Sequence, residues 1–215
     1  MSAAVISLAA AGKSGDCDTR YRRLLGDRAW LRLPPEVRRR FSKRLAPGSQ
    51  THYSGEVVCV ELSRAGWLLA HIGRLLGGPL PLTHNGLGAC MVTVTEDPTL
   101  GGQIWSRSYP RPGRFPQVVH SAKRFRGPTG LEEYLGFGFL MRLTMHEEAT
   151  QLVFRSAGYA IEIAGRSFAV PSWLAPGRCT VIHRAETDKR FSFTLTLDHP
   201  WLGRLVHQVA FFEDA

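Results

Sequence analysis

Residues 191–197 read FSFTLTL, with an apolar side chain at each odd-numbered position and a hydroxyl side chain at each even-numbered one. A period of two also runs through residues 179–183 and 205–211. Because successive side chains of a β-strand point to opposite faces, this alternation indicates strands with one buried face and one solvated face. Strands of this kind are typical of antiparallel sheets. The C-terminal part of the chain therefore predicts an antiparallel sheet, whose concave face could hold a ligand.

Similar alternation occurs upstream, in residues 55–62, 89–95, 103–109, 139–145, 151–155 and 159–163. Helices are expected mainly near the N-terminus: one that Gly26 ends, one that Pro34 and Pro35 open, and one over residues 65–76. We therefore predict an α+β fold that is mostly β, with a curved antiparallel sheet or partly closed barrel of about eight or nine strands and about three helices. We expect a flexible tail over residues 1–17 and a single domain over residues 18–215.

The chain carries a net charge of +9, and most of this excess lies in residues 20–45. Such a segment can contact an anionic surface, or it can form the solvated face of a helix. The composition favours the solvated face, so we expect at most weak contact of residues 20–45 with an anionic surface. No recognition module accompanies the basic residues, and specific binding of nucleic acid is not expected.

The four cysteines lie far apart and form no C-x-x-C pair. This spacing favours reduced thiols and predicts no metal site; no cofactor is expected either. No run reaches the roughly 18 apolar residues that a transmembrane helix needs. The short apolar start at residues 3–11 is not preceded by Lys or Arg, so we expect a cytoplasmic protein.

Several short motifs occur in a set order: YRRLLG at residues 21–26, the stretch 33–41, GGPLP at 77–81, WSR at 105–107, PSWLAPG at 171–177 and HPWLG at 199–203. With these motifs, the chain from about residue 19 onward resembles the bacterial domain of unknown function DUF4166. The resemblance brings no established catalytic residue with it. Members occur alone or attached to other domains, including dehydrogenase-like ones. Here no G-x-G-x-x-G follows a strand, so dinucleotide binding of that type is not expected.

Gln103, Trp105, Arg107 and Tyr109 share one phase of a predicted strand. On a concave face they would offer an aromatic ring, a cation and two hydrogen-bonding groups. This set suits an apolar ligand that carries one anionic or carbonyl group. On an outer face the same residues would form an ordinary polar surface, and both interpretations remain open.

His183 and His207 lie in the apolar phase of their predicted strands. An inward imidazole is either hydrogen-bonded in a core or exposed to a wet cavity, and two histidines without a third ligand do not predict a metal site. Arg142 lies among large apolar residues, where an ion pair with Glu132 or Glu133 is favoured over a catalytic role.

The sequence favours a small soluble protein that binds an apolar or amphipathic, lipid-like molecule on the concave face of the sheet. One alternative is a metal-independent enzyme of the acid–base isomerase, cyclase or hydrolase type. It would act on an apolar substrate through His183, His207 and Arg107, with Glu132 or Glu133. Another is an accessory domain whose groove holds a segment of a partner protein. The pattern is equally typical of an open cavity and of a packed core.

Overall fold

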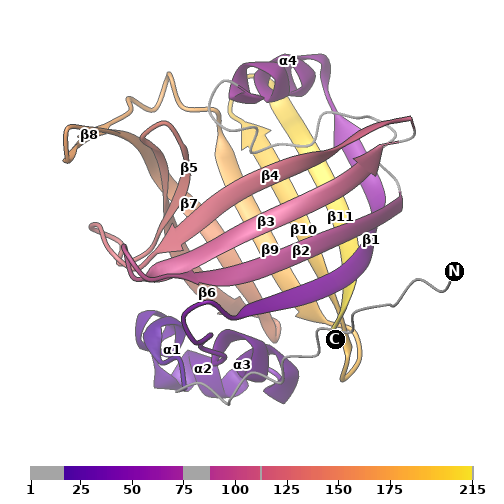
Figure 1. Cartoon of the computed structure of the whole chain (residues 1–215). Coiled ribbons are helices and arrows are strands. Elements are labelled where there is room, and N and C mark those ends of the chain that lie inside the picture. The colour runs from indigo at the N-terminus through magenta and orange to yellow at the C-terminus, as the bar shows by residue number, and fades with distance from the viewer. Residues whose placement is uncertain (1–16, 75–87, 112, 215) are drawn as a thin grey trace, which may run out of the picture.

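The computed structural model describes residues 17–74, 88–111 and 113–214. In this part of the chain, antiparallel strands pair in the order β6-β5-β4-β3-β2-β1-β11-β10-β9-β7-β8. Pairing of β6 with β7 closes the sheet, so ten strands form a barrel and β8 extends one edge of β7 (Figure 1). The strands are β1 (Gln50–Leu62), β2 (Gly88–Asp97), β3 (Gly102–Arg111), β4 (Arg114–Arg124), β5 (Glu132–Gly136), β6 (Phe139–Glu148), β7 (Gln151–Ile163), β8 (Arg166–Ala169), β9 (Arg178–Ala185), β10 (Arg190–His199) and β11 (Gly203–Asp214).

The predicted α+β fold with a mostly β barrel is confirmed, and the barrel is fully closed. The predicted runs 151–155 and 159–163 belong to one long strand, β7. The alternation did not reveal β4, β5 or β8. The predicted tail lies outside the described residues except for Cys17, which forms an isolated β-bridge with Lys43. Residues 77–81 of the motif set also lie outside the described residues.

Three short helices, α1 (Arg20–Leu25), α2 (Asp27–Arg32) and α3 (Pro35–Phe41), lie together at one end of the barrel. The fourth, α4 (Arg64–Gly73), lies at the opposite end (Figure 1). The sequence did not predict α2, because it follows α1 after Gly26 alone. That glycine adopts φ +83, a left-handed conformation that ends one helix and starts the next. None of the described helices is long and apolar enough to cross a membrane.

The position of α4 depends on one glycine. Ser63 begins the helix, and its hydroxyl oxygen accepts a hydrogen bond from the Gly66 backbone N–H at 3.0 Å. Gly66 lies directly on β11: a Cβ at this position would be 1.9 Å from the Leu205 carbonyl oxygen. Only glycine allows this approach, so the helix is held closely against the mouth of the barrel.

Aromatic side chains fill the end of the barrel beneath α1–α3. The Tyr21 ring lies 5.1 Å from Phe41 and 4.9 Å from Phe125, both in edge-on arrangements. His183 stacks on Phe191 at 5.1 Å and is fully buried. This end of the barrel is therefore a packed core.

Part of the positive charge of residues 20–45 is neutralised by ion pairs in the folded chain. Arg20 forms ion pairs with Asp18 at 2.7 Å and Glu96 at 2.8 Å, and Arg40 pairs with Asp214 at 2.8 Å. These pairs attach the helices to β2 and β11, so part of the positive charge serves the fold.

Candidate functional site

The middle of the barrel and its α4 end are hollow. They enclose a cavity of about 370 Å³, with Phe41 at the α3 end and Leu69, Ile72 and Leu174 at the α4 end. Phe193 and Leu195 face this cavity yet are only partly buried, although they are large apolar residues on an inward phase. The space beside them is therefore an open cavity in the middle of the barrel, while the end beneath α1–α3 is packed.

One wall of the cavity is apolar. β10 contributes Phe193, Leu195 and Leu197, and the neighbouring strand β9 contributes Cys179 and Val181. The alternation quoted from residues 191–197 thus identified the inward face of β10 correctly. Phe193, Leu195 and Leu197 line the cavity, and the hydroxyl side chains between them lie on the other face.

The facing wall carries a charged cluster, which we define as Arg107, Ser121, Lys123 and Glu133, from β3, β4 and β5. Lys123 and Glu133 are register partners on adjacent strands, and their Nζ and Oε2 atoms lie 3.1 Å apart. The Ser121 hydroxyl donates to Glu133 Oε1 at 2.7 Å and accepts from Arg107 Nη1 at 3.0 Å. Arg107 Nη2 lies 3.6 Å from Glu133 Oε1.

Burial and charge act in opposite directions on Glu133. Burial would raise the pKa of its carboxyl, but Lys123, Arg107 and the Ser121 hydroxyl lower that pKa to about 2. Burial also lowers the pKa of the Lys123 ammonium, an effect that the Glu133 carboxylate opposes and Arg107 reinforces. The cluster therefore contains an ionised carboxylate held by two cations, and Lys123 and Glu133 are only 8% and 7% exposed.

The ring of Trp105, which also lines the cavity, lies near both cations. The Lys123 ammonium lies 5.0 Å from the centroid of the Trp105 ring, and the Arg107 guanidinium lies 5.9 Å from the same centroid. Cations are attracted to the faces of such rings, most strongly to that of tryptophan. Trp105 thus borders both the charged cluster and the apolar space.

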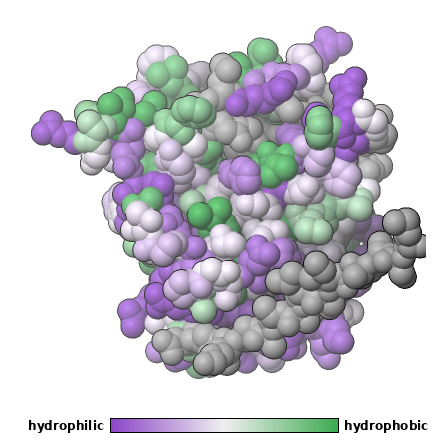
Figure 2. Space-filling view, in the orientation of Figure 1, coloured by the Kyte–Doolittle hydropathy of each residue, from purple (hydrophilic) through white to green (hydrophobic). Residues whose placement is uncertain are grey.

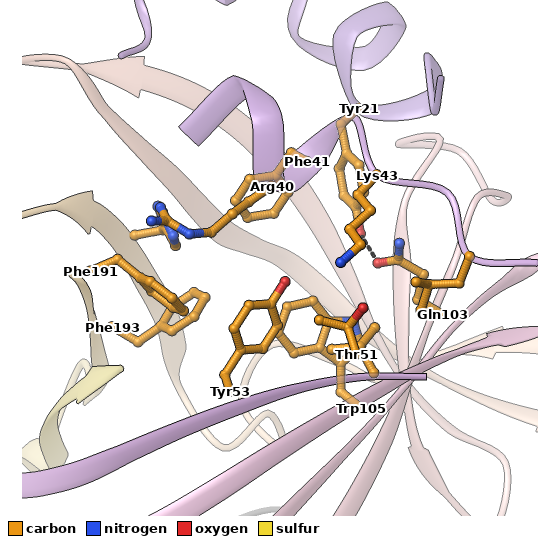
Figure 3. A pocket seen from close by; sticks show the side chains of 13 residues that line it. Tyr21, Arg40, Phe41, Lys43, Thr51, Tyr53, Gln103, Trp105, Phe191 and Phe193 are labelled. Atoms are coloured by element: carbon orange, nitrogen blue, oxygen red, sulfur yellow. Dashed lines mark hydrogen bonds between the residues drawn. The ribbon is translucent and has the colours of Figure 1, made fainter. Parts of the chain in front are cut away.

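A second, much smaller pocket of about 30 Å³ lies next to the packed end. Figure 3 shows its lining: the Tyr21 hydroxyl donates to Gln103 Oε1 at 2.8 Å, and Lys43 and Tyr53 extend into the space nearby. His183 also lines it, and neither of its ring nitrogens has a hydrogen-bond partner among the described residues. Burial, reinforced by Arg40, lowers the pKa of His183 to about 3, so the ring is neutral near physiological pH.

Four of the residues singled out in the sequence meet at the large cavity: Trp105, Arg107, Tyr109 and Glu133. Gln103 lies on β3 with Trp105, Arg107 and Tyr109 but lines the small pocket. The open choice between a concave and an outer face for this strand is therefore decided by the structure: the face is concave and borders a cavity.

The remaining predicted residues lie elsewhere. The inward orientation predicted for His207 is wrong, because β11 lines the cavity with Gln208, Ala210 and Phe212, and His207 lies on the other face near Thr196. His183 faces the small pocket, not the large cavity.

Arg142 does not form the expected ion pair within the described part of the chain. Its register partner Glu132 contacts Arg126 instead, at 3.3 Å, and Glu133 belongs to the charged cluster. Arg142 alternates with Met141 and Leu143, which line the cavity, so it lies on the outer face of β6.

Ser121 and Lys123 were not predicted, because the strand that carries them, β4, was not recognised. Among the described residues, no group of three or more His, Cys, Asp or Glu side chains could hold a metal ion. No curated protein and no solved structure matches the chain. The domain of unknown function DUF4166 matches residues 33–212, which is most of the chain, and the protein therefore belongs to the DUF4166 family.

Proposed function

We propose that this protein binds an apolar or amphipathic small molecule, such as a lipid, inside the barrel. The observation that carries the proposal is the cavity of about 370 Å³, with an apolar wall on β9 and β10. Pockets that bind small molecules have volumes of about 300–1,000 Å³ and are lined mainly by apolar and aromatic side chains with a few polar groups. The cavity of this barrel has the same size and composition.

A ligand in this cavity would gain free energy from its apolar surface. Burial of apolar surface stabilises by about 25 cal/mol per Å². Water in contact with Phe193, Leu195 and Leu197 finds no hydrogen-bonding partner on that wall, so its replacement by a hydrocarbon is favourable. The affinity is thus expected to increase with the length of an apolar chain until the cavity is full.

We expect the ligand to enter at the α4 end. Leu69, Ile72 and Leu174 line the cavity there, and apolar side chains reach the surface around them (Figure 2, top). Trp173 and Trp201, from the segments before β9 and before β11, are 65% and 76% exposed. Exposed apolar side chains beside a cavity are typical of a surface that contacts an apolar partner or ligand.

The binding test uses a matched pair of variants on one strand. Ala210 faces the cavity, and its neighbour Val209 faces the other side of β11. Ala210→Phe fills part of the cavity and is expected to weaken binding of a fluorescent apolar probe, whereas Val209→Phe is expected to leave it unchanged. Native mass spectrometry of the purified wild type is expected to show a co-purified apolar molecule. Equal probe binding by both variants and the wild type would contradict the proposal.

The buried Lys123–Glu133 pair favours a second candidate function, an acid–base enzyme that acts on the bound molecule. In that case a ligand extracted from the inactive Lys123→Met variant would change chemically on incubation with the wild type. Incubation with fresh Lys123→Met would leave the same ligand unchanged. Recovery of that ligand unchanged after incubation with the wild type would contradict the enzyme and leave binding as the function of the cavity.

Contact of residues 20–45 with an anionic surface is a separate proposal, because these residues lie at the opposite end from α4. The exposed basic residues of this segment that form no ion pair with described residues are Arg23, Arg28, Lys43 and Arg44, and they are the candidates for such contact. Co-sedimentation with anionic vesicles that weakens as salt is added would support it. Equal sedimentation with neutral and anionic vesicles would contradict it.

A further inference from the structure

We propose that the ligand carries a single anionic head group, such as a carboxylate, which binds Arg107 and Lys123 while its apolar tail extends along the cavity. This inference rests on the proposed function, because it assigns the chemistry of the molecule that the cavity holds. It follows from three observations: the charge balance of the cluster, its unused hydrogen-bond donors and its place in the barrel.

The charge of the cavity lining is not balanced. Among the described residues, the charged side chains that line it are Arg107, Lys123 and Glu133. Two cations face one carboxylate, which leaves one positive charge in an otherwise mainly apolar space. An unbalanced charge is costly away from water. A ligand with one negative charge would balance it.

Both cations have donors to spare. The Lys123 ammonium has three N–H bonds, and among the described residues its hydrogen-bond partner is Glu133. The Arg107 guanidinium has five N–H bonds and donates to Ser121 within the same part of the chain. The remaining donors lie beside the cavity, where a carboxylate could accept from both groups.

The cluster lies deep in the barrel. β4 pairs with β3 so that Lys123 is opposite Gln103, whose side chain contacts Tyr21 of α1. This places the head-group site toward the α1–α3 end. The opposite, α4 end of the cavity is lined by Leu69 and Leu174.

An apolar wall faces the cluster across the cavity. In the closed sheet, β10 is five strands away from β4, so the two strands lie on opposite sides of the barrel. Figure 1 shows β3 and β4 crossing in front of β9 and β10. A ligand with its head at Lys123 would therefore lay its tail against Leu195 and Leu197 and extend toward α4.

The test compares three ligands that share one tail: dodecanoate, dodecan-1-ol and dodecyltrimethylammonium. Each is titrated calorimetrically into wild-type protein from which bound lipid has been extracted, near neutral pH and below its aggregation concentration. Dodecanoate is expected to bind at least about tenfold more tightly than the alcohol, because charge-assisted hydrogen bonds are worth more than neutral ones. The ammonium compound is expected to bind most weakly of the three.

A variant separates the head group from the tail. Arg107→Met keeps the Lys123–Glu133 pair but removes the excess charge, so it is expected to lose most of the preference for dodecanoate while binding the alcohol as before. The matched control is Arg190→Met, at an exposed arginine that pairs with Glu56 on the outer surface; it is expected to bind all three ligands like the wild type. The wild-type ligand series decides the assignment even if Arg107→Met does not fold.

The outcomes distinguish this inference from the proposed function. Equal affinity of the wild type for dodecanoate and dodecan-1-ol overturns the head-group assignment and leaves the apolar cavity as a binding site. Absence of binding of all three overturns both. Dodecyl phosphate, which can carry two negative charges, tests the charge count: it is expected to bind more weakly than dodecanoate, and tighter binding would contradict a single-charge site.

Discussion

The buried imidazole of His183 is expected to lower the free energy of unfolding as the pH falls. His183 is fully buried between Phe41, Phe191 and Phe193, with neither ring nitrogen hydrogen-bonded to a described residue. Arg40 lies over Phe191, and Lys43 and Tyr53 line the same small pocket. A proton on this ring would thus be buried close to other cations, with no described acid to pair with it.

The size of the effect follows from the two pKa values of His183. Burial, with the charge of Arg40, lowers its pKa from 6.5 to about 3 in the folded protein. The unfolded chain therefore binds the proton more readily, so the contribution of His183 to stability is complete above the unfolded pKa and is lost as the pH falls toward the folded one. Between about pH 7 and pH 5 the loss is about 2 kcal/mol, at about 1.4 kcal/mol per pH unit below the unfolded pKa.

The assay is urea denaturation of the wild type and of His183→Leu at a series of pH values. Leucine has a similar volume and no proton to bind, so the variant is expected to lose about 2 kcal/mol less than the wild type between about pH 7 and pH 5. The comparison cancels every other titrating group that the two proteins share. Parallel losses in the two proteins would show that His183 is protonated in the folded state and would refute the reasoning.

Three further predictions concern the charged cluster, α4 and the packed end. Glu133→Gln leaves two cations of the cluster without their carboxylate and is expected to lower the free energy of unfolding by about 3–5 kcal/mol, measured by urea denaturation; a change below about 1 kcal/mol would contradict the buried pairing. Gly66→Ala places a methyl group against the Leu205 carbonyl, so its melting temperature is expected to fall by several degrees, whereas an unchanged value would show that α4 is not held there. Tyr21→Phe removes the donor to Gln103 and is expected to lower the free energy of unfolding by about 1–2 kcal/mol in the same urea measurement; an unchanged value would contradict a stabilising role for this buried hydrogen bond.

The residues of β10 show why much of the fold could be predicted from the sequence. Its inward side chains are Phe and Leu, and the side chains between them are Ser and Thr, so periodicity and burial agree. The same agreement located β2, β6 and β9, whereas on β3 periodicity predicted the strand but not which face is inward. Closure of the barrel could not be predicted in the same way, because it depends on pairing of β1 with β11 and of β7 with β9, which are distant in sequence and leave no local pattern.

β11 shows how the same method chose the wrong face. Leu205, Val209 and Phe211 form an apolar series that includes His207, but the series with Gln208, Ala210 and Phe212 lines the cavity. Both faces of this strand carry apolar residues. The inner face includes one polar residue, Gln208, and one small residue, Ala210. Periodicity cannot distinguish two faces that both carry apolar residues.

Only two of the four residues of the charged cluster were predicted from the sequence. Arg107 and Glu133 were singled out, but Ser121 and Lys123 lie on β4, whose inward positions near the cluster are polar. A strand that presents serine and lysine to the barrel interior lacks the alternation by which strands are recognised. Such local departures from the expected pattern are frequent at functional sites, and the residues missed here lie in the site proposed to bind the head group.

We infer that the barrel is a container whose charged site lies deep inside it. The most direct measurement is a crystal structure of the protein after incubation with dodecanoate. We expect electron density for one extended chain inside the cavity, with the carboxylate within hydrogen-bonding distance of Arg107 and Lys123 and the tail against Leu195 and Leu197. A barrel interior filled by side chains, or a ligand found only on the outer surface, would contradict it.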